Sequence, residues 1–136
     1  MSSISTIALS GMNAAARRLE VSASNVANVM STGALPNADG TVPAGAPRAY
    51  APLELVQTAS AGGGIQTTVT TATPSTTAVS NPQAPFANQN GLVAAPNVDL
   101  AQEMVGQMIA RYSFAANATV MKADDRMTKT LLNITA

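Results

Sequence analysis

Proline is confined to the middle of this chain, and that distribution decides where long helices can form. All eight prolines lie between residues 31 and 96, whereas residues 2–30 and 97–136 contain no proline and one glycine each. Because proline interrupts helices, we expect one helix in each flank. The sequence thus predicts three zones: an N-terminal helix at 1–33, a Pro/Gly-rich middle segment at 34–96 and a C-terminal helix at 97–136.

The N-terminal flank carries apolar residues at the spacing of one helix face. Arg17, Arg18 and Glu20 lie outside this stripe, and a helix of roughly 25 residues would be near 40 Å long. We expect Gly33 to end the helix in a left-handed conformation. The stripe comprises Ile4, Ala8, Met12, Ala15, Leu19, Ala23, Val26 and Met30.

The C-terminal flank shows a longer stripe with a mean spacing of about 3.7 residues, which is typical of a straight or coiled-coil-like helix. Asn97 and Asp99 are both candidates for its N-terminal cap. The stripe comprises Ala101, Val105, Ile109, Tyr112, Ala116, Val120, Ala123, Met127, Leu131 and Ile134. Met104, Met108, Ala115, Ala118 and Met121 widen the apolar face, which indicates contact with more than one neighbouring helix.

The middle segment has strand character in two places. Residues 53–56 and 65–71 are rich in apolar and β-branched side chains, and residues 59–64 can turn between them as a loose hairpin. Residues 36–47 and 74–96 read as extended loops. The predicted fold is therefore mainly α, with two long helices packed as a coiled-coil-like pair around an irregular, β-hairpin middle.

The composition indicates a chain that depends on partners to complete its core. Hydrophobic residues make up 46 % of the chain, but most are Ala and Val, and aromatic residues make up 3 % with no Trp. Large side chains supply most of the free energy of core burial, and a domain of this size is marginal without them. We therefore expect the apolar faces to be buried on other chains.

The residue inventory excludes several classes of function. The chain has no Cys and no His, and seven basic residues balance seven acidic ones. Disulfides, Cys-based zinc sites and imidazole catalysis are excluded, and no basic field exists to bind nucleic acid. No apolar run is long enough to insert in a membrane, and we expect no cleaved secretory signal. The carboxylates show no spacing that demands catalysis or a metal, so we expect no enzyme activity and no cofactor.

A short motif near the end of the first helix resembles a known family. Ser24-Asn25-Val26-Ala27-Asn28-Val29 is similar to the Asn-x-Ala-Asn signature of bacterial flagellar axial proteins of the rod and hook. Further blocks, in order, are similar to proximal rod proteins of the basal body. These blocks are Asp39-Gly40, Pro47-Arg48-Ala49-Tyr50, Gly91-Leu92-Val93, Pro96-Asn97-Val98, Glu103-Met104-Val105, Met108-Ile109 and Arg111-Tyr112-Ser113-Phe114-Ala115-Ala116-Asn117. Leu92 stands where that family usually has an aromatic residue, and Gly62-Gly63-Gly64 has no counterpart in its pattern.

The resemblance implies a structural subunit of the flagellar proximal rod, which polymerises through its terminal helices and transmits torque across the periplasm. It implies export by the flagellar type III apparatus without a cleaved signal. The implied partners are copies of the chain, other proximal and distal rod proteins, the junction of the rod with the MS ring, and the export apparatus. Alternatives are another flagellar or type III secretion axial component, or a helical adaptor that binds an export chaperone.

The predicted subunit contacts lie on both helices. They are Ile4, Ala8, Met12, Ala15, Leu19, Asn25, Val26, Asn28, Met104, Val105, Met108, Ile109, Tyr112, Phe114, Asn117, Val120, Met127 and Leu131. The alternative for the stripes is a two-helix core within one chain. Asn25, Asn28 and Asn117 would set the register between subunits or serve as ordinary caps. We expect Asp124-Asp125-Arg126 to be a solvated face.

Overall fold

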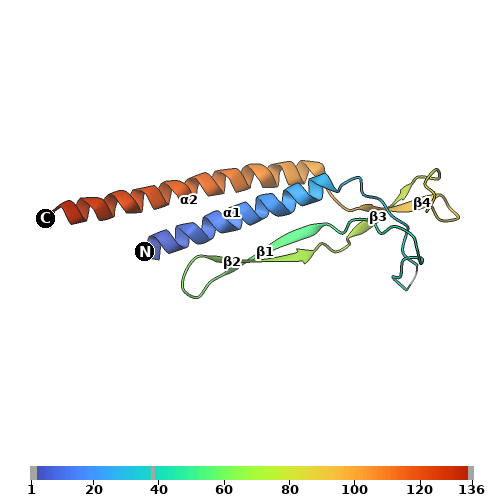
Figure 1. The fold of residues 1–136 in the computed structure, drawn as a ribbon, viewed down its shortest axis with the longest axis horizontal. Helices are drawn as coiled ribbons and strands as arrows, with labels where there is room; N and C mark the ends of the chain where they lie inside the picture. Colours follow the sequence, from blue (N-terminus) through green and yellow to red (C-terminus); the bar gives the residue numbers. More distant parts are fainter. Residues whose placement is uncertain (1–2, 38, 135–136) are drawn as a thin grey trace. The chain divides into compact units, whose positions relative to one another are not determined.

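The computed structural model describes residues 3–37 and 39–134 and contains two long helices joined by small strand pairs (Figure 1). Strands β1 and β2 form one two-stranded sheet, and β3 and β4 form another. This confirms a mainly helical chain with a β-hairpin at the middle. The elements are α1 (Ser3–Ala27), β1 (Leu53–Ala59), β2 (Ile65–Thr71), β3 (Thr76–Ser80), β4 (Leu92–Pro96) and α2 (Leu100–Ile134).

Asp99 begins α2. Its Oδ1 accepts hydrogen bonds from the backbone N–H groups of Ala101, at 2.8 Å, and Gln102, at 3.1 Å. These are two of the four donors that a helix start leaves without an internal partner. Asn97 instead donates from its side chain to the carbonyl of Pro74. Of the two predicted caps, Asp99 is therefore the one that the structure uses.

Gly33 has a different role from the one that the sequence predicted. Helix α1 ends at Ala27, and the φ angle of Gly33 lies outside the left-handed region. Gly33 instead forms a β-bridge with Ala94, and a Cβ atom at this position would lie 2.2 Å from the backbone N of Ala49. The prediction of a left-handed helix end was wrong, because glycine is needed here to let another backbone segment approach.

The pairing of β3 with β4 was missed by the sequence analysis, which treated residues 74–96 as a loop. The strands are antiparallel, and their register runs from Thr76 opposite Pro96 to Ser80 opposite Leu92. Each strand has only five residues, and proline stands at the end of the ladder, where no further hydrogen bond is interrupted. Val93 is fully buried, so this short pair contributes to the core.

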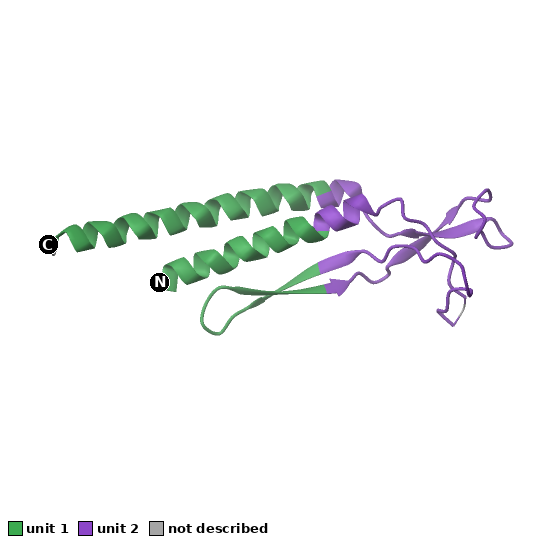
Figure 2. Ribbon diagram, in the orientation of Figure 1, with its two compact units in different colours: residues 1–21, 55–69, 104–136 green, residues 22–54, 70–103 purple. Residues whose placement is uncertain are grey.

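The chain divides into two compact units, and each combines segments from both helices and the middle (Figure 2). Unit 1 contains residues 1–21, 55–69 and 104–136. Unit 2 contains residues 22–54 and 70–103. The helices therefore take part in both units, and neither unit corresponds to one continuous stretch of sequence.

In unit 1, α1 and α2 lie side by side and run antiparallel (Figure 1). Ser5 donates a hydrogen bond to the carboxylate of Asp124, and Gly11 faces Asn117. A Cβ atom at Gly11 would lie 2.6 Å from the Asn117 Oδ1 atom, so the absence of a side chain sets how closely the helices approach. We call this contact the helix seam. Its other buried members are alanines: Ala8, Ala15 and Ala110.

The turn between β1 and β2 packs on α1 through its glycines. Gly63 and Gly64 adopt φ angles of 84° and 86°, which side chains rarely adopt. A Cβ atom at Gly64 would lie 2.3 Å from the Ser10 Oγ atom, and this same oxygen accepts a 3.2 Å hydrogen bond from the backbone of Ile65. Turn geometry and close approach to α1 thus explain Gly63 and Gly64, whereas a Cβ atom at Gly62 would meet nothing within 4 Å.

The helix seam predicts opposite effects for two helical glycines. Gly11→Ala should lower the free energy of unfolding by about 1–2 kcal/mol, because overpacking against Asn117 outweighs the gain in helix propensity. Gly106→Ala is the control, since a Cβ atom there meets nothing within 4 Å, and it should stabilise α2 by up to about 1 kcal/mol. Urea denaturation followed by circular dichroism measures both, and equal effects would contradict the packing described for Gly11.

Candidate functional site

Several large apolar side chains of α2 lie on the side away from α1. Met108 and Tyr112 are each about 160° around the helix from Ala110, which is buried in the helix seam. Tyr112 is 77 % exposed and Met104 is 59 % exposed. We call this surface the outer face of α2, and it comprises Met104, Val105, Met108, Ile109 and Tyr112.

Most of the predicted contact residues are exposed in the structure. The exposed ones on α1 are Ile4 and Leu19. Those on α2 are Met104, Val105, Met108, Ile109, Tyr112, Phe114, Val120, Met127 and Leu131. Side chains of this kind are accessible to another protein, and their contact with a second subunit stays a prediction.

Three predicted contacts are buried within the chain. Ala8, Ala15 and Asn25 are 1 %, 5 % and 2 % exposed. Their side chains are covered by the chain itself, which leaves them little surface for a second subunit, and a subunit contact at these positions stays a prediction. The physical reason for the alanines is their small size, which lets α1 and α2 pack closely.

The remaining predicted contacts are half-buried: Met12, Val26, Asn28 and Asn117. Asn28 donates from its side chain to the Ser24 carbonyl at 2.9 Å, one turn earlier. Asn117 donates to the Ser113 carbonyl at 2.8 Å while packing against Gly11. Both amides therefore bond to the turn that precedes them, Asn28 at the end of α1 and Asn117 within α2. A register-setting contact of either residue with a second subunit stays a prediction.

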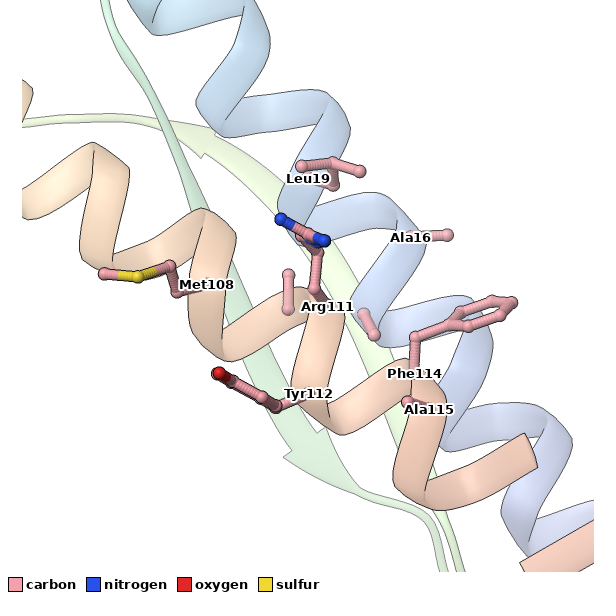
Figure 3. Close-up of a pocket in the computed structure, with 9 residues that line it drawn as sticks. Ala16, Leu19, Met108, Arg111, Tyr112, Phe114 and Ala115 are labelled. Carbon is pink, nitrogen blue, oxygen red and sulfur yellow. The ribbon is translucent and has the colours of Figure 1, made fainter. Parts of the chain in front are cut away.

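A groove of about 640 Å³ lies between α1 and α2 in unit 1 (Figure 3). Leu19 and Ala16 line it from α1, and Phe114 and Arg111 line it from α2. In Figure 3 the Phe114 ring points toward α1, whereas Tyr112 projects away from it. The lining is mostly apolar, so the groove suits a side chain or helix ridge of another protein rather than a polar metabolite.

Asn25 is the centre of a hydrogen-bond network in unit 2. Its Nδ2 donates to the Leu53 carbonyl at 2.9 Å and to Glu103 Oε1 at 2.6 Å. Its Oδ1 accepts from the Leu53 N–H at 2.9 Å and from the Tyr50 hydroxyl at 3.0 Å. Four bonds are the full capacity of an amide side chain, so this buried group is satisfied. We call these residues the Asn25 network.

The network extends through two serines. The Ser24 and Tyr50 hydroxyls are 3.0 Å apart, and Ser22 donates to the Glu103 carbonyl at 3.2 Å. Sequence reasoning singled out Asn25 but missed that Tyr50 and Glu103 are its partners. The sequence signal that could have pointed to these two residues is that each lies in a block similar to the rod-protein family, Tyr50 at 47–50 and Glu103 at 103–105.

The charged residues that the structure describes are not grouped into a metal-binding site. Among the residues that the structure describes, no three His, Cys, Asp or Glu side chains are grouped to hold a metal ion. The Thr41 hydroxyl and backbone N–H hydrogen-bond to the Asp39 carboxylate and lower its pKa below the usual value. Asp124 is 7 % exposed, so the prediction of a solvated face was wrong for it. No helix within residues 3–37 and 39–134 is long and apolar enough to span a membrane.

Two family matches cover the helices and their flanks. Residues 6–34 match the family described as "Flagella basal body rod protein", and residues 89–134 match "Flagellar basal body rod FlgEFG protein C-terminal". The chain is also similar to "Flagellar basal-body rod protein FlgC" of Salmonella typhimurium and of Salmonella typhi. Each is 38 % identical over 130 residues, which is 92 % of this chain and 91 % of the relative.

The Asn25 network predicts a large effect of one isosteric change. Asn25→Asp replaces two N–H donors with an oxygen that faces the Leu53 carbonyl and the Glu103 carboxylate. We expect the free energy of unfolding to fall by about 3 kcal/mol at pH 7, since buried acceptors lose their donors and like charges meet. Asn28→Asp is the matched control and should cost at most about 1 kcal/mol, because it loses one bond at a helix end. Comparable midpoints of urea denaturation for the two variants would refute the proposed importance of the network.

Proposed function

Because this chain belongs to the flagellar basal-body rod protein family and is a FlgC-like structural rod subunit, we propose that it polymerises through its terminal helices into the proximal rod. In this proposal the helices form a tubular, coiled-coil-like assembly, and the assembly transmits torque as a drive shaft. The observation that supports the proposal is the outer face of α2, whose large apolar side chains are left about half exposed or more by the chain itself.

Small side chains form the core of the chain, and the larger apolar ones stay at its surface. The buried apolar residues of the described chain are small: six are alanine and the others are Val21 and Val93. The large apolar side chains of the outer face remain about half exposed or more. Full burial of one such side chain contributes roughly 1.5–3 kcal/mol, so covering the exposed half of each gives about 1 kcal/mol. Summed over the five residues of the outer face, this is about 5 kcal/mol in favour of association, which offsets part of the entropy lost when subunits bind.

The close helix seam also suits a load-bearing assembly. Gly11 and the seam alanines bring α1 and α2 together without large side chains between them, and close-packed interiors have low compressibility. The methionines of the outer face are flexible enough to fit neighbours that are not identical. A subunit that contacts several kinds of rod protein needs that tolerance.

The proposal includes a place and a set of partners. Rod proteins belong to the flagellar basal body, where this subunit assembles with other rod components. We propose that its contacts are copies of itself, other proximal and distal rod proteins and the junction with the MS ring. Its location would be the rod within the periplasm, reached through the flagellar type III export apparatus without a cleaved signal.

We propose no catalytic activity, cofactor, nucleic-acid binding or membrane insertion. The buried polar groups described above are engaged in hydrogen bonds that hold the fold, as the Asn25 network illustrates. A group that is fully committed to structure is a poor candidate for proton transfer or nucleophilic attack. In this proposal the chain acts by associating with other protein subunits.

The test disrupts the outer face without touching the helix seam. Val105→Asp combined with Ile109→Asp should raise the concentration for half-maximal self-association more than about tenfold, because burying two charges opposes contact. In a motile strain that has this chain as its only copy, the variant should abolish swimming in soft agar. Asn13→Asp, at an exposed polar position of α1, is the control and should leave both readouts unchanged.

Analytical ultracentrifugation measures the association, and circular dichroism checks that helix content is retained. If the double variant associates and swims like the unaltered chain, the outer face is not a subunit contact and the proposal fails. If the unaltered chain stays a monomer and its loss leaves the basal body intact, an adaptor role replaces the structural one.

A further inference from the structure

One flank of α2 gathers cations that have no carboxylate partner. Arg111, Lys122 and Arg126 are exposed, and within the described part of the chain none of them forms an ion pair. Spacings of eleven and four residues place all three within about 60° of arc around the helix. We call this strip the basic flank of α2, and it borders the outer face. Figure 3 shows its first member, Arg111, beside Leu19 at the groove.

The three cations of the basic flank add little to the stability of α2 itself. Arg126 lies four residues after Lys122 and three before Lys129, and like charges at these spacings destabilise a helix. Cations favour a helix end only within its last turn, yet no basic residue lies in the last turn of α2. Lys129 already pairs with Asp125 at 2.6 Å. The basic flank therefore has no evident role in the isolated subunit.

A second copy of this chain offers few carboxylates that are not already engaged within it to neutralise the basic flank. Glu20 is paired with Arg17 at 2.7 Å, and Asp125 is paired with Lys129. Asp99 caps α2, Asp39 binds Thr41, and Glu103 belongs to the Asn25 network. Glu54 is an exposed carboxylate that forms no ion pair within the described residues, but it lies in β1 rather than on a helix.

We infer that the basic flank docks a helix of a different protein, and that this helix presents carboxylates beside an apolar stripe. Three cations in line next to exposed apolar side chains match such a helix in charge and in hydrophobicity. Complementary charge of this kind selects partners and fixes register more than it adds affinity. The inference rests on the proposed function, because it assigns one surface of the rod subunit to an unlike neighbour rather than to a copy of itself.

Charge reversal distinguishes an unlike neighbour from a copy. The variant Arg111→Glu/Lys122→Glu/Arg126→Glu should reduce recovery of the chain in detergent-purified basal bodies at least tenfold, measured by immunoblot. Its self-association, measured by sedimentation, should stay within about twofold of the unaltered chain. The single variant Arg48→Glu, at an exposed loop position without an ion pair, is the control and should change neither readout.

A neutral variant separates the effect of reversed charge from that of a folding defect. Arg111→Gln/Lys122→Gln/Arg126→Gln keeps side-chain length and helix propensity, and it should lower recovery less than the glutamate variant does. Circular dichroism should show equal helix content for all three proteins. Normal recovery of the folded glutamate variant would overturn the inference, and so would a fivefold or greater loss of self-association, which would assign the flank to a second copy.

The neighbour is identified by cross-linking in cells. A photoreactive phenylalanine at Ala115, which is exposed on the same flank, should cross-link a different protein through a peptide that contains Asp or Glu. Cross-linking to this chain itself, or to a peptide without carboxylates, would contradict the inference. Binding of the purified chain to phosphatidylglycerol vesicles but not phosphatidylcholine vesicles would also overturn it, since a basic flank beside an apolar face can suit an anionic membrane.

The failure of this inference is separable from failure of the proposed function. If the outer-face variant Val105→Asp/Ile109→Asp abolishes assembly but the charge-reversed variant assembles normally, only the basic-flank inference fails. If both variants assemble normally, the proposal that α2 makes subunit contacts fails with it.

Discussion

The packing of α1 on α2 through small and polar side chains is the constraint on which the character of this subunit depends. Gly11 leaves room for the Asn117 amide, Ser5 hydrogen-bonds Asp124, and alanines fill the rest of the helix seam. A seam of this composition buries little apolar area, so it cannot also enclose the methionine, isoleucine and tyrosine side chains of α2. Those side chains face outward because the contact inside the chain is made without them, and association is the means available to cover them.

The Asn25 network explains why the blocks of the family resemblance occur together. Asn25 comes from the end of α1, Tyr50 and Leu53 from the segment that enters β1, and Glu103 from the first turn of α2. A buried amide with four satisfied bonds tolerates few alternatives, because each lost bond leaves a buried polar group without a partner. The motif thus specifies how one chain folds, rather than how two chains meet.

The sequence predicted the elements that depend on periodicity and failed where the chain folds back on itself. Both helices, the Asp99 cap and the strands on either side of Gly62-Gly63-Gly64 follow from local spacing and turn chemistry. The pairing of β3 with β4, the close approach at Gly33 and the burial of Asp124 depend on residues far away along the chain. At the candidate site, the exposure of the large apolar side chains of α2 agrees with the predicted stripe. The burial of Ala8, Ala15 and Asn25 within the chain was not foreseen, because a helical stripe does not tell which neighbour covers it.

The two sides of α2 differ in how strictly they define their neighbour. The seam-facing side of α2 carries polar groups that accept one partner geometry, since a shift of register would leave Asn117 and Asp124 without their contacts on α1. Its opposite side carries methionine and aliphatic side chains that repack at low cost. In the proposed rod, a subunit built in this way would keep one internal structure while its outer face contacts neighbours of different shape. The basic flank of α2 would then supply what apolar contact lacks, which is discrimination between a correct and an incorrect neighbour.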